Sequence, residues 1–141
     1  MALKLLLPAI LVLIVDQLTK TLVARCLAEG QSVFIGPCVR IRHVANAGGR
    51  QWFVRNPPAL LLLWGSALVS IILVVQQGYF FRHAAAQIGL GAALGGAASN
   101  LYDRLRRGVV IDFLNVGWWP VFNLADVAIT LGAIGALWFI R

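Results

Sequence analysis

The chain has 141 residues, of which 60% are hydrophobic and only 12% are charged, and its formal net charge at pH 7 is +7. Soluble proteins carry roughly 25% charged residues, so this composition excludes an ordinary soluble domain. The arginines lie in short stretches between apolar segments, where they would meet anionic lipid head groups, and no nucleic-acid-binding motif accompanies them. We therefore expect a membrane protein that has phospholipids, and not nucleic acid, as partners.

Four apolar segments are long enough to cross a bilayer as helices, which takes about 20 residues each. They cover about residues 3–26, 58–76, 84–101 and 120–140. An open sheet would leave backbone groups unsatisfied in lipid, so helices are expected. No small-residue cleavage site follows the first segment, and we expect it to be retained and not removed as a signal peptide. The predicted fold is an all-α membrane protein with a bundle of four transmembrane helices in a single domain, residues 1–141.

Two longer loops connect these helices and would lie on the same face of the membrane. The first, about residues 27–57, is rich in β-branched residues with glycine and proline between them, which predicts a small sheet or hairpin at the membrane surface. The second, about residues 102–119, contains Trp118 and Trp119, which are typical of interfacial anchors. Cys26 and Cys38 lie near or in the first loop and are either a disulfide or two free thiols.

Polar residues within apolar helices are functional candidates, because ionisable groups at membrane depth are costly. Asp16 and Lys20 are four residues apart, and this spacing predicts a salt bridge on one helix face. Asp103 and its neighbour Arg104 are most simply an ion pair that fixes the third helix. Two asparagines, Asn100 and Asn123, also belong to this group. They either form hydrogen bonds between helices or contact substrate.

Glycines in the third segment have a structural interpretation. The stretch "GLGAALGG" contains Gly89, Gly91, Gly95 and Gly96. Small residues allow helix backbones to approach closely in membranes, so we expect this helix to pack tightly against its neighbours.

Asp112 and Asp126 have no obvious cationic partner in the sequence. Two carboxylates that share a site differ in pKa, so that one is ionised while the other is protonated. Such a pair can activate a water and protonate a leaving amine. The metal-binding pattern HExxH, a serine beside a histidine and a glycine-rich phosphate loop are all missing from the sequence, so we expect no metal and no cofactor. Acid–base catalysis by aspartates is the chemistry that remains.

Four segments, "DQLTK", "NAG", "SNLYDRLRRGVVIDF" and "FNLADVAITLG", resemble the signature segments of the lipoprotein signal peptidases (signal peptidase II), in the same order. The resemblance implies an aspartic endopeptidase of the bacterial inner membrane. Such an enzyme cuts the signal peptide of a prolipoprotein just before the diacylglyceryl-modified cysteine, so prolipoproteins would be its partners. By motif, Asp112 and Asp126 would be the catalytic dyad. Residues that would support the site or orient substrate are Asp16, Lys20, Asn46, Gly48, Asn100, Asp103, Arg104 and Asn123.

The chain departs from the usual family pattern at two places. It reads "NAGGRQWF" after the first asparagine, and Ser99 stands where the family usually has glycine. Both departures are expected near the substrate groove and not at the dyad, so they concern substrate preference. A divergent paralogue that handles a restricted set of lipoproteins fits this pattern.

Charge and resemblance disagree on orientation. Most arginines lie on the side of the longer loops, which by the positive-inside rule would be cytoplasmic. The resemblance implies the reverse, with cytoplasmic termini and an active site near the extracytoplasmic face, and we follow the resemblance.

Two other functions remain open. A small four-helix transporter would make Asp16 the indispensable residue, whereas a peptidase would make Asp112 and Asp126 indispensable. A catalytically idle lipoprotein-binding paralogue would tolerate the loss of either dyad aspartate.

Overall fold

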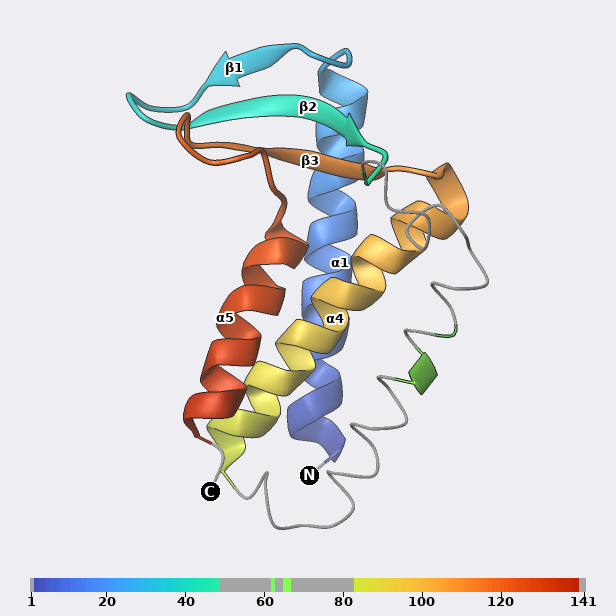
Figure 1. Ribbon diagram of the computed structural model, residues 1–141, viewed down its shortest axis with the longest axis vertical. Coiled ribbons are helices and arrows are strands. Elements are labelled where there is room, and N and C mark those ends of the chain that lie inside the picture. Colours follow the sequence, from blue (N-terminus) through green and yellow to red (C-terminus); the bar gives the residue numbers. More distant parts are fainter. Residues whose placement is uncertain (1, 49–61, 63–64, 67–82, 140–141) are drawn as a thin grey trace.

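The structure is a computed structural model that describes residues 2–48, 62, 65–66 and 83–139. Within these ranges three helices lie side by side, and a three-stranded sheet crosses one end of them (Figure 1). The helices are α1 (Ala2–Cys26), α4 (Ala84–Arg107) and α5 (Leu124–Trp138), and α4 packs against both of the others. The helical segment predicted at residues 58–76 lies outside the described residues, apart from residues 62, 65 and 66.

Helix α1 has the length and composition of a membrane-spanning helix. Its segment Leu3–Cys26 is, among the described residues, the one helix long and apolar enough to span a bilayer. At 1.5 Å per residue the 25 residues of α1 extend about 37 Å, more than the hydrocarbon thickness. Helix α5 is apolar but shorter. The structure thus confirms the first predicted helix, and the total of four spanning helices stays a prediction.

Helix α4 is longer than the sequence predicted. The apolar segment ends near residue 101, but the helix continues to Arg107. It ends at Gly108, which adopts a left-handed conformation with φ of 74° and donates its N–H to the Arg104 carbonyl at 3.0 Å. This is the usual glycine C-cap. The prediction ended the helix too early because charged residues outside lipid continue a helix as well as apolar ones.

Glycines allow α4 to approach both neighbouring helices closely. A Cβ atom added at Gly89 would lie 2.7 Å from the carbonyl oxygen of Gly132 on α5. Added at Gly95, it would overlap the backbone of Ala9 on α1. Gly91 meets α1 and Gly96 meets α5 in the same way. The predicted tight packing through these glycines is therefore confirmed.

The sheet has the order β1-β2-β3, with strands Ser32–Phe34, Arg40–Asn46 and Val110–Asn115, all antiparallel. The first two strands form the hairpin that the sequence predicted in the first long loop. Strand β3 was not predicted, and it comes from the second long loop. Its pairing with β2 places Asp112 opposite Val44 and thereby carries Asp112 to the helices that hold the other polar residues.

Candidate active site

Asp112 is a buried carboxyl group on β3, with only 3% of the residue exposed. Asn46 on β2 donates to its Oδ2 at 2.8 Å, and Asn123 donates to its Oδ1 at 2.7 Å. Burial raises the pKa of Asp112 above its ordinary value, the hydrogen bond from Asn46 opposes this shift, and the charge of Asp126 adds to it. The carboxyl group of Asp112 therefore holds a proton more readily than a solvent-exposed aspartate does.

Asp126 occupies the first turn of α5, where a capping box holds it. The Asn123 side chain accepts from the Asp126 N–H at 2.9 Å, and the Asn123 N–H donates to Asp126 Oδ2 at 3.3 Å. Asn100 on α4 donates to Asp126 Oδ1 at 2.9 Å. The predicted fourth helix therefore begins at Leu124 and not near residue 120, because Asn123 adopts an extended conformation and caps it.

Asn123 joins the two aspartates. It is fully buried, its amide nitrogen donates to Asp112, and its oxygen and backbone N–H hold Asp126. Phe122 pairs with Leu114 on β3 just before this point, which returns the chain from the sheet to α5. The structure thus brings both predicted dyad residues to one site.

A buried ion cluster lies beside this site. Asp16, Lys20 and Asp103 are each 0% exposed, and the Lys20 ammonium lies 2.6 Å from Asp16 Oδ2 and 2.9 Å from Asp103 Oδ2. Lys20 also donates to Asn100 Oδ1 at 2.8 Å. The amide oxygen of Asn100 therefore faces Lys20 while its NH2 group faces Asp126. The predicted salt bridge between Asp16 and Lys20 is confirmed, and Lys20 reaches the site through Asn100.

Asp16 also holds the start of α5. Its Oδ1 accepts from the backbone N–H of Ala125 at 2.9 Å, and its Oδ2 accepts from the Ser99 hydroxyl at 2.6 Å. Gln17 donates to Ser99 Oγ at 2.9 Å and to Asp103 Oδ1 at 3.1 Å. Ser99 is completely buried in this cluster and does not line the pocket beside Asp126, and its expected position near the substrate groove stays a prediction. Gln17 was not predicted, although it is a polar residue within an apolar helix.

The predicted ion pair between Asp103 and Arg104 is not formed. Asp103 instead pairs with Lys20 and, at 3.4 Å, with Arg107 one helical turn further on. Adjacent helical residues do not face each other, whereas residues four apart do. Among the described residues, Arg104 has a buried Nη1 without a hydrogen-bond partner, and no hydrogen bond or ion pair joins it to either dyad aspartate.

Gly48 supports the site through Asn46. It has a positive φ of 78°, and its N–H donates to Asn46 Oδ1 at 2.9 Å. With its oxygen held by Gly48, Asn46 presents its NH2 group to Asp112. No group of three or more His, Cys, Asp or Glu side chains able to hold a metal ion occurs among the described residues.

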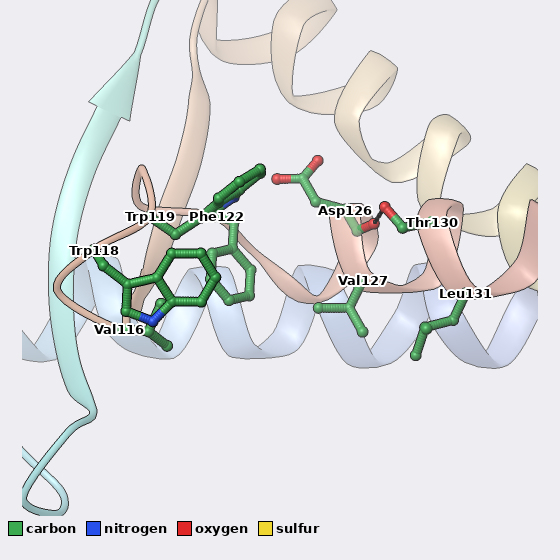
Figure 2. A pocket seen from close by; sticks show the side chains of 8 residues that line it. All are labelled: Val116, Trp118, Trp119, Phe122, Asp126, Val127, Thr130 and Leu131. Atoms are coloured by element: carbon green, nitrogen blue, oxygen red, sulfur yellow. Dashed lines mark hydrogen bonds between the residues drawn. The ribbon is translucent and has the colours of Figure 1, made fainter. Parts of the chain in front are cut away.

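An open, mainly apolar pocket of about 500 Å³ borders Asp126. Figure 2 shows Trp118, Trp119 and Phe122 on one side of it and the first turns of α5 on the other, with the Asp126 carboxylate between them. Trp118 and Trp119 are largely exposed, as expected for interfacial anchors. The pocket therefore offers an apolar ligand access to the aspartate.

A helix long and apolar enough to cross a bilayer, with a buried and a half-buried carboxyl group held together at one end of it, is typical of a membrane enzyme. A solved structure titled as a bacterial membrane enzyme is similar, with a TM-score of 0.73 and 27% identity over 93% of this chain and 88% of that one. The lipoprotein signal peptidase of Pelotomaculum thermopropionicum is 40% identical over 90% of this chain and 84% of its own length. That of Moorella thermoacetica is 38% identical over 94% and 89%.

The family model described as signal peptidase (SPase) II matches residues 8–141. The chain therefore belongs to the signal peptidase II family, and its activity is that of a signal peptidase. This family membership decides against the transporter alternative.

Proposed function

We propose that the chain is an aspartic endopeptidase in which Asp112 and Asp126 are the catalytic dyad. The observation that carries this proposal is the position of Asn123, whose side chain and backbone hold the buried carboxyl group of Asp112 and the half-buried carboxyl group of Asp126 at one site. Asn46 and Asn100 each add one hydrogen bond to one aspartate. The neutral amides of these three asparagines do not titrate, so proton transfer is carried out by the two carboxyl groups.

The surroundings of the two carboxyl groups differ. Burial raises the pKa of Asp112 and favours its protonated form. Asp126 lies in the first turn of α5, where the capping box with Asn123 fixes its position. Asn100, oriented by Lys20, donates a hydrogen bond from its NH2 group to Asp126. In our proposal Asp112, which holds its proton more readily than an exposed aspartate, is the acid and Asp126 is the base.

The reaction then needs only a water and the peptide bond. Ionised Asp126 takes a proton from the water, whose oxygen attacks the scissile carbonyl carbon while Asp112 protonates the carbonyl oxygen. The resulting tetrahedral diol loses the amine when Asp126 passes its proton to the leaving nitrogen. One diol hydroxyl returns a proton to Asp112 as the new carboxylic acid forms, and both aspartates regain their starting states.

The proposed substrates are bacterial prolipoproteins, cut just before the diacylglyceryl-modified cysteine. Their apolar signal peptide and lipid suit the apolar pocket beside Asp126. We further propose a single peptidase domain, residues 1–141, that crosses the inner membrane as four helices. In this arrangement the dyad lies near the extracytoplasmic face, where the sheet crosses the helix ends.

The test compares wild type with Asp112→Asn and Asp126→Asn, all purified as full chains, on a prolipoprotein that already carries its diacylglyceryl group. Each change keeps the side-chain shape and removes the proton transfer, so cleavage should fall at least about 10³-fold. Glu29→Gln is the matched control, since Glu29 is an exposed carboxylate outside the site. Gel mobility reports cleavage, and thermal unfolding shows that each variant is folded.

Retained turnover in both aspartate variants would refute the proposed dyad. No cleavage by folded wild type would instead support the idle paralogue.

A further inference from the structure

A second groove lies between α1 and α4 and shares no lining residue with the pocket beside Asp126. Its volume is about 430 Å³. On α1 it is lined by three apolar residues, Leu13, Ile14 and Leu18, and by Gln17 and Thr21, and on α4 it is lined by Tyr102, Arg106 and Arg107. The signal peptidase activity requires none of these residues in our mechanism, so the groove needs its own explanation.

The groove changes from apolar to polar along the helix axes. Ile14 and Leu18 are 47% and 64% exposed on a helix that is apolar enough to cross a bilayer. Tyr102, Arg106 and Arg107 lie in the last two turns of α4, which end beside the sheet (Figure 1). From Leu13 to Thr21 the lining of α1 extends about 12 Å at 1.5 Å per residue. This is the polarity gradient of one bilayer leaflet from hydrocarbon to head group.

The two arginines keep hydrogen-bond donors for a ligand. Arg106 is exposed, its Nη1 lies 2.6 Å from the Tyr102 hydroxyl, and the described residues provide no carboxylate partner for it. Arg107 lies 3.4 Å from Asp103, whose charge is already shared with Lys20. The polar end of the groove is therefore cationic, and phosphate is the group that paired guanidinium groups bind best.

We propose that this groove binds one anionic phospholipid of the bilayer. An acyl chain lies along Leu13, Ile14 and Leu18, and the phosphate contacts Arg106 and Arg107. Charge complementarity selects the anionic lipid, because the cationic end has no surplus carboxylate to attract the amine of a zwitterionic head group. The site is independent of the proposed dyad, so either proposal can fail without the other.

The experiment titrates the purified full chain, freed of lipid in detergent, with phosphatidylglycerol or phosphatidylcholine and counts bound lipids by native mass spectrometry. We expect one phosphatidylglycerol to bind about tenfold more tightly than phosphatidylcholine. Arg106→Gln together with Arg107→Gln should remove this preference. The matched control is Arg40→Gln together with Arg42→Gln, which removes two exposed arginines from β2, outside the groove, and should keep the preference.

A third variant covers the case in which loss of Arg107 destabilises the protein through Asp103. Leu18→Trp fills the apolar part of the groove and leaves every charge in place, so it should abolish the tight phosphatidylglycerol site. Equal affinity for the two lipids in wild type would overturn the proposal and leave the arginines as cations at a helix C-terminus. An equal loss in the β2 control, or unchanged binding in Leu18→Trp, would overturn it as well.

Discussion

Asn123 illustrates how much of this site depends on single side chains. Its NH2 group donates to Asp112 and to Asn100, and its oxygen accepts from the start of α5. A buried amide with all its partners in place fixes the positions of the groups around it, and each lost partner would leave a buried polar group unsatisfied. Asn100, which is half-buried, is held in the same way between Lys20 and Asp126. These neutral side chains connect the buried ion cluster to the two aspartates of the proposed dyad.

Asn46→Ala tests the acid role of Asp112 through the pH dependence of kcat/KM. The hydrogen bond from Asn46 lowers the pKa of Asp112 by favouring the ionised form. Without this hydrogen bond the pKa of Asp112 rises further, so the protonated acid persists to higher pH. The alkaline limb of the kcat/KM profile therefore moves to higher pH. Asn115→Ala is the control, because Asn115 lies on the same strand and its side-chain oxygen accepts from the Gly117 N–H in the following turn. Movement of the acidic limb instead would make Asp112 the base.

At the scale of elements, α4 organises the site. Its glycines bring α1 and α5 each into close contact with α4. The next two turns of α4 carry Ser99, Asn100 and Asp103 into the space between the three helices. Hydrogen bonds at 2.6–2.9 Å between side chains of three helices require these short interhelical distances. The small residues of one half of α4 therefore make the polar network of the other half possible.

Gly95→Ala should destabilise the protein by about 1–3 kcal/mol, because the added methyl group would overlap the Ala9 backbone. Gly135→Ala is the matched change on α5, where a Cβ atom would meet nothing within 4 Å. There alanine favours the helix, and a gain of about 0.5–1 kcal/mol is expected. Thermal unfolding midpoints in detergent measure both. A Gly95→Ala midpoint equal to or above wild type would contradict the close packing of α1 and α4.

At the scale of the whole molecule, the sheet lies at one end of the helices, beside the end of α4 and the start of α5 (Figure 1). The proposed dyad and the arginines of the proposed lipid site belong to these elements. The exposed arginines at this end conflict with the positive-inside rule only if their charge has no other function. Arg107 pairs with Asp103, and Arg40 lies 4.6 Å from the Phe34 ring. Such local uses of charge are consistent with a sheet outside the cytoplasm.

The native cysteines test this orientation, since both Cys26 and Cys38 are free and exposed near the sheet. In a Cys26→Ser variant, a membrane-impermeant maleimide should label Cys38 in intact spheroplasts. The control carries Lys4→Cys at the opposite end of α1 and no other cysteine, and it should react only after lysis. The opposite labelling pattern would place the sheet in the cytoplasm, as the charge count alone predicts.

The sequence alone determined what depends on neighbours along the chain. The apolar length of α1, the Asp16–Lys20 pair, the glycines of α4 and the β1–β2 hairpin follow from helix and strand periods that act over a few residues. The motifs around Asp112 and Asp126 also indicated the family correctly. All these features are local in sequence, so no knowledge of the packed fold was needed.

Only the tertiary structure decided which distant residues meet. Pairing of β3 with β2 carries Asp112 to Asn46, 66 residues away in sequence, and α4 packing brings Ser99 to Asp16, 83 residues away. The same packing makes Lys20, and not Arg104, an ion-pair partner of Asp103. Such contacts depend on the distances between helices and on the direction of each side chain. Both are fixed only when all the elements have packed, so the spacing of residues along the chain does not predict them.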